Sequence, residues 1–341
     1  MSASTSGVVD GEPRETNVVT AIRDALHDEM AADDRVILLG EDVANRGGVF
    51  RISAGWMDEF GPERVIDTPL AEAGIVGVAI GMALRGLLPV AEIQFADFIH
   101  PAFDQIVSEA ARMRYRSNGA FGCPMVIRAP CGGGIHGALY HSQSIEAFYA
   151  HVPGLKVVMP STPADAAGLL RSALRDPDPV LFLEHKKTYR AVKGPVPDGP
   201  FLVPLGSADV KRAGTDLTCI SYGYALHTCV EAASRLFDDE GVSVEVVDVR
   251  SLAPLDTDTM FTSVRSTSRV MVVYEDNRTY GAGAEIASTI AETLMFDLDA
   301  PIVRIGGPDI PAMPFAAPLE HFFMEPEPDQ VYRRMRDLAA F

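Results

Sequence analysis

Short apolar runs alternate along this chain with segments whose apolar residues recur every three or four positions. This alternation is typical of a parallel sheet whose strands are joined by crossover helices. In the first half of the chain it predicts strands at Val36–Leu39, Val90–Ile93, Met125–Ile127, Lys156–Met159 and Val180–Leu183. It predicts helices at 19–30, after Thr68, near 101–117 and at 163–175. We therefore expect one complete α/β domain in this half.

The alternation stops between Lys186 and Ala213, in a stretch rich in proline and glycine. Proline fits poorly inside regular elements, so we interpret this stretch as a linker between domains. Beyond it the pattern predicts strands at 217–221, 244–249, 270–274 and 302–305, and helices at 225–239, after Pro254, at 284–294 and at 329–340. The expected order is a flexible tail at 1–15, a first domain at 16–185, the linker at 186–213 and a smaller second domain at 214–341. The expected fold class is α/β, with two doubly wound domains.

Acidic residues outnumber basic ones by 47 to 29, which gives a formal net charge of −18. A surface this negative repels the phosphates of nucleic acids and of anionic lipids, so we expect no nucleic acid and no membrane as a partner. The uncharged stretch Ala73–Leu84 is shorter than the roughly 20 apolar residues that cross a bilayer. The first residues resemble neither a signal peptide nor a transit peptide. These features predict a cytoplasmic protein.

Several common chemistries lack their motifs in this sequence. No Gly-x-x-x-x-Gly-Lys-Ser/Thr loop is present, which argues against a nucleoside triphosphatase of that type. A Gly-x-Gly begins at Gly281, but Ile286 stands where a dinucleotide-binding loop requires its third glycine. There is no His-Glu-x-x-His pair for zinc, and Cys219 stands where a nucleophile elbow around Ser221 requires glycine. The four cysteines show no Cys-x-x-Cys spacing, and we expect them to be reduced and buried.

One candidate catalytic carboxyl stands at the start of a predicted helix, in Asp67-Thr68-Pro69-Leu70-Ala71-Glu72-Ala73-Gly74. We expect Thr68 to cap the helix and Pro69 to take its first position, which places Glu72 in the first turn beside free amide donors. A lone glutamate there is more often a surface residue that complements the helix dipole. The uncharged helix behind it, with Gly74, Gly77 and Gly81, favours burial against a neighbouring helix or subunit instead. Burial would remove water from the Glu72 carboxyl.

Two further segments leave the carboxyl ends of predicted strands, where ligands collect in open α/β sheets. The first, Glu92-Ile93-Gln94-Phe95-Ala96-Asp97-Phe98, ends with Gln94 and Phe98, although a phenylalanine is more often a core residue. The second is the glycine-rich loop 130–143, which carries His136 and His141. A loop histidine is usually just solvated, and we expect this of His136. The neighbours of His141 in Tyr140-His141-Ser142-Gln143 could fix its tautomer.

Together these segments resemble the β subunit of the thiamine-diphosphate-dependent decarboxylase of 2-oxo acid dehydrogenase complexes, in the transketolase-like family. The resemblance extends over nearly the whole chain from Asn17. The run Glu92-Ile93-Gln94-Phe95-Ala96-Asp97 is most similar to the branched-chain (2-oxoisovalerate) type. One departure is Phe98, where the mammalian branched-chain subunit has tyrosine. The resemblance implies a pyrimidine-binding first domain and a transketolase C-terminal-type second domain.

The resemblance also implies roles for individual residues. Glu72 would hydrogen-bond the pyrimidine N1′ of thiamine diphosphate, with Leu70, Gln94 and Phe98 around the same ring. His141 would act as a proton donor or charge stabiliser during acyl transfer to a lipoyl group. The substrate would be 3-methyl-2-oxobutanoate or a similar 2-oxo acid. A structural potassium ion is implied on mostly backbone carbonyls of Cys123, Met125, Val126, Ala173, Asp176 and Asp178.

Chains of this superfamily that hold the cofactor's diphosphate carry Gly-Asp-Gly, which is absent here. The resemblance therefore implies that an α subunit holds the diphosphate and Mg²⁺, in an α2β2 heterotetramer. A lipoyl acyltransferase core is the expected further partner. Acidic residues near the chain end, Glu320, Glu325, Glu327 and Asp329, could face such a partner, although a charge cluster is more often a solvated surface.

Other functions remain open at this point. Pyruvate or acetoin could replace the branched-chain substrate, as in the β subunits of pyruvate or acetoin dehydrogenases. The chain could instead be a non-catalytic subunit that only docks the α subunit to the core. A third alternative, one half of a split transketolase that acts on sugar phosphates, requires basic residues around the site, and loop 130–143 has none.

Overall fold

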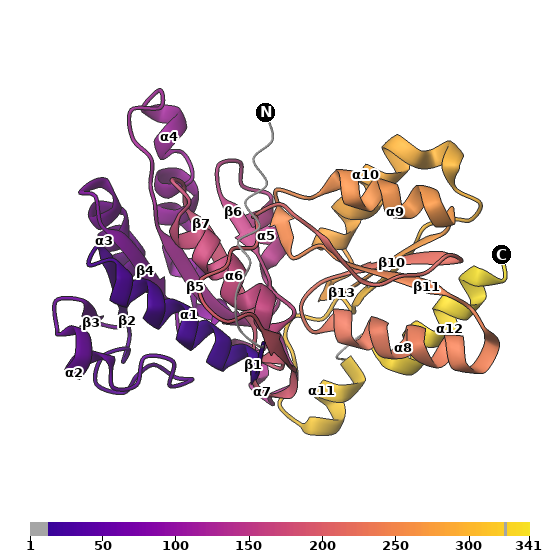
Figure 1. The fold of residues 1–341 in the computed structure, drawn as a ribbon, viewed down its shortest axis with the longest axis horizontal. Coiled ribbons are helices and arrows are strands. Elements are labelled where there is room, and N and C mark those ends of the chain that lie inside the picture. Colours follow the sequence, from indigo (N-terminus) through magenta and orange to yellow (C-terminus); the bar gives the residue numbers. More distant parts are fainter. Residues whose placement is uncertain (1–12, 324–325) are drawn as a thin grey trace.

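The computed structural model describes residues 13–323 and 326–341, which form two α/β domains that lie next to each other (Figure 1). The predicted fold class is therefore confirmed. Most of the tail predicted at 1–15 lies outside the described residues. Its last residues do not form a tail, because Arg14 and Glu15 begin strand β1 (Arg14–Asn17).

The first domain is built on a seven-stranded sheet in the order β12-β6-β7-β5-β4-β2-β3. Its strands are β2 (Val36–Gly40), β3 (Val65–Asp67), β4 (Leu88–Glu92), β5 (Val126–Cys131), β6 (Lys156–Val158), β7 (Val180–His185) and β12 (Ser251–Ala253). All neighbours pair in parallel except β12, which runs antiparallel to β6. β12 comes from the part of the chain assigned to the second domain, so the second domain completes the sheet of the first.

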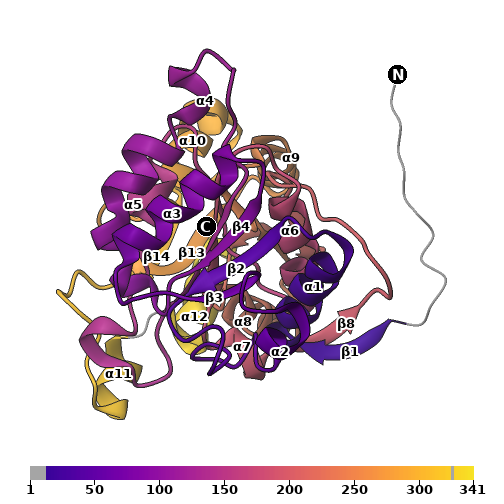
Figure 2. The same cartoon turned by 90° about the vertical axis from the view of Figure 1, so that its left-hand side faces the viewer.

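Helices cover both faces of this sheet (Figure 2). One face packs against α1 (Val18–Ala32) and α6 (Pro163–Leu174), and the other against α3 (Glu72–Leu84) and α5 (Glu146–Ala150). Asn17 caps α1 by accepting a hydrogen bond from Thr20 N at 2.9 Å. The single helix predicted near 101–117 is instead a series of short turns: a 3₁₀ turn at His100–Ala102, a π-helix at Gln105–Ala110 and α4 (Met113–Arg116). The short α2 (Trp56–Phe60) was not predicted.

The stretch predicted as an irregular linker contains three regular elements: α7 (Thr188–Ala191), β8 (Lys193–Val196) and β9 (Asp209–Arg212). β8 pairs with β1 in a two-stranded antiparallel ribbon. Pro195 is tolerated there because such a ribbon has open edges. β9 joins the sheet of the second domain.

The second domain has a five-stranded sheet in the order β14-β13-β10-β11-β9. Its remaining strands are β10 (Leu217–Ser221), β11 (Val244–Asp248), β13 (Val270–Asn277) and β14 (Val303–Gly307). The helices are α8 (Ala225–Glu240), α9 (Thr257–Thr267), α10 (Ala282–Leu294), α11 (Ala317–Phe323) and α12 (Pro328–Ala339). In Figure 1, α9 and α10 lie on one side of this sheet and α8 and α12 on the other. The predicted strands and helices of this half are confirmed, and α11 and β12 are additions.

A buried charge cluster joins three central strands of the first domain. The Arg128 guanidinium on β5 is 1% exposed. It donates to Glu184 on β7 at 2.7 and 2.9 Å and to Glu92 on β4 at 2.7 Å. The Tyr189 hydroxyl also donates to Glu184. Burial raises the pKa of Glu92, although Arg128 opposes this shift. The cluster joins the end of β4 to the middle of β5 and to the end of β7, and the candidate site begins beyond the carboxyl ends of β4 and β5.

The described parts of the chain settle two further predictions. All four cysteines are free and buried, as expected. Among the described helices, none has the length and apolar character needed to cross a bilayer.

Candidate active site

Glu72 is the first residue of α3, and it is buried at 9% exposure. Its predicted place in the first helical turn is therefore confirmed, but the predicted cap is wrong. The helix starts after Ala71, which makes no side-chain cap. Thr68 instead continues β3, because its N–H donates to Gly40 O at 2.9 Å. The Thr68 hydroxyl is buried, without a hydrogen-bond partner among the described residues.

A second carboxyl, which the sequence analysis missed, lies beside Glu72. Glu41 directly follows β2, and its Oε1 atom is buried without a hydrogen-bond partner in the described part of the chain. Burial raises the pKa of Glu41, and the negative charge of Glu72 raises it further. The sequence signal that could have identified Glu41 was its position at the carboxyl end of a predicted strand. Two acids at one sheet edge form an acceptor site for a ligand with polar hydrogens.

The helix behind Glu72 is buried on one face only. Ile75, Val76, Ala79 and Ile80 belong to the core. The other face carries the predicted glycines and is exposed, with Val78 at 53%. The core face confirms part of the predicted burial, and contact of the opposite face with another subunit stays a prediction.

An aromatic cluster follows β4. The ring of His141 meets the ring of Phe95 edge-on at 4.4 Å between centroids and that of Phe98 at 5.4 Å. The structure therefore brings together two segments that the sequence analysis singled out separately. Phe95 was not predicted as a site residue. Gln94 is half-buried between β4 and this cluster, and Leu70 is 81% exposed.

The glycine-rich loop that carries His141 is closed at its base. Gly132 N donates to Gln143 O at 2.9 Å, and Gln143 N donates to Asp97 Oδ1 at 3.3 Å. Within the loop, His136 and Ala138 both have φ of 58°, a left-handed conformation that is uncommon outside glycine. His136 is not merely solvated as expected, because its ring pairs with the buried Glu320.

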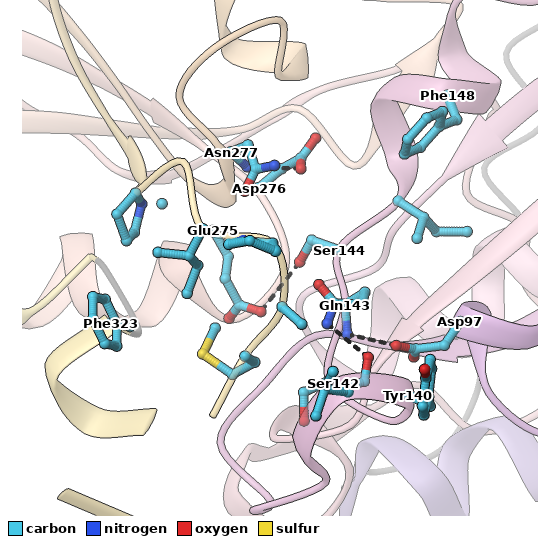
Figure 3. Close-up of a pocket in the computed structure, with 18 of the residues that line it drawn as sticks. Asp97, Tyr140, Ser142, Gln143, Ser144, Phe148, Glu275, Asp276, Asn277 and Phe323 are labelled. Carbon is cyan, nitrogen blue, oxygen red and sulfur yellow. Dashed lines mark hydrogen bonds between the residues drawn. The ribbon is translucent and has the colours of Figure 1, made fainter. Parts of the chain in front are cut away.

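Figure 3 shows a cavity between this loop and the carboxyl ends of β13 and β14. Its volume is about 470 Å³. Glu275 on β13 accepts from Ser144 Oγ at 3.1 Å across the cavity wall. Burial raises the pKa of the adjacent Asp276 to about 6. Polar groups of both domains thus meet next to the His141 loop.

The residues implied for potassium lie together at the opposite edge of the sheet. Cys123 N donates to Pro177 O at 3.1 Å, and Val180 N donates to Met125 O at 3.0 Å. Val126 begins β5, and Ala173 lies in the last turn of α6. These contacts bring the two segments side by side.

The carboxylates of that group already have cationic partners. Asp176 accepts from Lys156 Nζ at 2.6 Å, and Asp178 accepts from Arg114 Nε at 2.7 Å. Within residues 13–323 and 326–341, no group of three or more His, Cys, Asp or Glu side chains could hold a metal ion. The potassium site stays a prediction that depends on carbonyl oxygens.

The acidic cluster near the chain end does not form a single surface. Glu320 is 1% exposed and accepts hydrogen bonds from loop amides, so the prediction that it faces a partner is wrong. Glu327 pairs with His321 at 3.1 Å, and Asp329 pairs with Arg235 at 2.8 Å. Glu325 lies outside the described residues.

Comparison with known proteins agrees with this geometry. The family profile "Transketolase, pyrimidine binding domain" matches residues 14–192, and "Transketolase, C-terminal domain" matches residues 206–331. The 2-oxoisovalerate dehydrogenase subunit beta of Bacillus subtilis is 54% identical, over 95% of this chain and 98% of that protein. The chain belongs to the β-subunit family of the 2-oxo acid dehydrogenases.

Other members of the β-subunit family are nearly as similar. The Bacillus subtilis pyruvate dehydrogenase E1 component subunit beta is 48% identical, over 86% of this chain and 90% of that protein. The Mycobacterium tuberculosis 3-methyl-2-oxobutanoate dehydrogenase subunit beta is 47% identical, over 92% and 89%. A solved structure described as a split-gene transketolase in an inactive beta4 tetramer shares the fold, with a TM-score of 0.75 at 24% identity, over 95% of this chain and 98% of that one.

Proposed function

We propose that this chain is the catalytic β subunit of a branched-chain 2-oxo acid dehydrogenase, and that it binds the pyrimidine half of thiamine diphosphate. The observation that carries the proposal is the pair Glu41 and Glu72 at the carboxyl edge of the sheet, in the domain that matches the pyrimidine-binding family. This edge is where α/β sheets bind ligands.

The residues present fit a pyrimidine ring. Glu41 Oε1 and Thr68 Oγ1 are buried polar atoms without partners among the described residues, and such atoms are costly unless a ligand or water satisfies them. Phe98 is half-buried and Leu70 exposed, so both leave apolar surface for a flat ring. The chemistry that thiamine diphosphate supplies when bound is an electron sink for the bond that releases carbon dioxide.

Each side chain then has a separate task. Glu72 would hydrogen-bond the pyrimidine N1′ of the bound cofactor, and removal from water would strengthen that hydrogen bond. Phe98 would lie against the ring, and Gln94 would border it. His141 presents a protonatable ring beside Phe95 and donates or holds a proton during acyl transfer to a lipoyl group.

The substrate assignment rests on similarity. The 2-oxoisovalerate relative is 54% identical and the pyruvate relative 48%, and the run Glu92–Asp97 resembles that of the branched-chain type. We therefore propose 3-methyl-2-oxobutanoate as the substrate. Pyruvate is the second candidate, and acetoin is a third that the sequence left open.

The proposed assembly is an α2β2 heterotetramer that delivers acyl groups to a lipoyl acyltransferase core. The α subunit would hold Mg²⁺ and the diphosphate, because this chain lacks Gly-Asp-Gly. The exposed apolar side of α3, next to Glu72, supports contact with that subunit. Potassium on the carbonyls around Met125 and Ala173 belongs to the same proposal. A cytoplasmic location stays a prediction from the sequence.

The test is Glu72→Gln in the complex with the α subunit. We expect decarboxylation of 3-methyl-2-oxobutanoate to fall by about 10²- to 10⁴-fold, as for loss of an acid-base group. Glu292→Gln, at an exposed position of α10, is the matched control. Near-normal decarboxylation by Glu72→Gln would favour a non-catalytic docking subunit.

Two further measurements separate the remaining alternatives. Comparison of pyruvate with 3-methyl-2-oxobutanoate in the wild-type complex tests the substrate. Tight, magnesium-dependent binding of thiamine diphosphate by the isolated chain, with turnover of 2-oxo acids, would contradict the proposed division between subunits.

A further inference from the structure

The loop that carries His141 is held by side chains of the other domain. The loop leaves β5 in the first domain, but two carboxylates that bind its backbone come from β13 and α11 in the second. Figure 2 shows α11 next to this loop, at the lower edge of the molecule. Neither carboxylate touches the His141 ring, so their effect on that residue is indirect.

Glu320 on α11 supplies the first anchor. Its Oε1 accepts from Gly134 N at 2.9 Å, and its Oε2 accepts from His136 N at 3.0 Å. The His136 ring pairs with the same carboxylate. Glu320 itself is 1% exposed. A buried carboxylate requires such donors, since an unsatisfied one is costly.

Glu275 at the end of β13 supplies the second anchor. Its Oε1 accepts from Gly133 N at 2.7 Å and from Ser144 Oγ at 3.1 Å, so it joins both ends of the loop. Its Oε2 faces His185 Nε2 at 2.7 Å. Burial alone would raise the pKa of Glu275, but His185, the Gly133 amide and Lys186 hold it at about 2. The carboxylate is therefore ionised at neutral pH.

The conformation of the loop requires support of this kind. His136 and Ala138 have left-handed φ angles, which are strained in a non-glycine residue and persist only where surrounding contacts impose them. The Glu320 contacts end at His136, five residues before His141. Without them, the segment between Gly134 and His141 could relax to an ordinary backbone conformation.

We propose that Glu275 and Glu320 are positioning residues, through which the second domain holds the loop of the first domain in the shape that places His141 beside Phe95. Their anchoring of the loop does not depend on the proposed function. Its effect on activity rests on the role proposed for His141. Loss of an anchor affects acyl transfer to the lipoyl group more than decarboxylation, because Glu72 lies on another element.

The experiment uses the complex with the α subunit and the variants Glu320→Ala and Glu320→Gln. In Glu320→Ala we expect hydrogen exchange of peptides within 132–143 to become about 10- to 100-fold faster, because amides lose a charged acceptor. We expect kcat for acylation of a lipoyl domain to fall by about 10- to 100-fold, with KM for that domain little changed. Decarboxylation measured with an artificial electron acceptor should fall less. Glu320→Gln keeps one oxygen and should rescue part of both effects.

Controls separate this inference from the proposed function. Glu292→Ala changes an exposed glutamate of the same domain and should leave exchange unchanged. If Glu320→Ala exchanges like wild type in the loop, the inference is overturned, whatever the activity. If exchange rises but His141→Ala retains full acylation, the anchoring is supported and the role proposed for His141 fails. If Glu320→Ala does not assemble with the α subunit, hydrogen exchange is measured in Glu320→Gln instead. Loop exchange equal to that of the wild type would again overturn the inference.

Discussion

Removal of the buried Arg128 guanidinium should destabilise the first domain more than most single substitutions. Arg128→Met keeps an unbranched apolar stem but leaves Glu92 and Glu184 without their shared cation. Three hydrogen bonds of 2.7 to 2.9 Å are lost, and both acids remain almost fully buried. Breaking a buried ion pair by removal of one partner costs about 3–5 kcal/mol.

The loss should depend on pH. Burial raises the pKa of Glu92 even in the presence of Arg128, and removal of Arg128 takes away the group that opposes this shift. A carboxyl with a raised pKa in the folded state contributes stability that is fully present below its unfolded pKa, near 4.3. That contribution is lost as pH rises through the folded value. Arg128→Met should therefore be least stable at alkaline pH and recover toward pH 5.

The assay is thermal unfolding at pH 5.5 and pH 8, with Arg112→Met as the control at an exposed position of the same domain. For a folding unit of about 150–250 residues, each kcal/mol shifts Tm by roughly 2–4 °C. The expected decrease at pH 8 is therefore about 6–20 °C. A decrease no larger than that of Arg112→Met, or one that is the same at both pH values, would refute the reasoning.

Two other substitutions test groups outside this cluster. Burial raises the pKa of Asp248 to about 7, with the charge of Asp165 adding to the shift, so the contribution of Asp248 to the stability of the native chain should fall as pH rises from about 4 to 7. Asp248→Asn should flatten that dependence in denaturant titrations, and an unchanged slope would contradict the assignment. Leu70→Ala should leave Tm nearly unchanged, because the side chain is 81% exposed, while it weakens thiamine diphosphate binding by the α/β complex. Calorimetry that finds equal affinity would remove Leu70 from the site.

The sequence predicted the central strands because each is a continuous apolar run. It did not predict β12, since Ser251-Leu252-Ala253 carries no pattern, and only the edge of β6 gives those residues a partner. The prediction that the linker lacks regular elements was wrong for a related reason. Proline marks edge strands as well as loops, and β8 finds its partner β1 far away in the sequence.

The site divides in the same way. Glu72, Phe98 and His141 stand in motifs that a reader can see in the chain. Phe95 was hidden in one of those motifs, and Glu41 gave only the weak signal of an acid after a strand. The contacts of Glu275 and Glu320 with the loop could not be predicted, because 142 and 186 residues separate the bonded partners. Such contacts are decided by how the domains pack.

The crossing of β12 into the neighbouring sheet has a consequence for how this protein can be divided. A cut between the two matched families, near residue 200, would look natural on a sequence map. It would leave β6 as an exposed edge strand of the N-terminal fragment. Exposed edge strands tend to pair with strands of other molecules. The three residues of β12 thus join the two halves in addition to the contacts of Glu275 and Glu320, and neither half is an independent module that could be moved to another protein unchanged.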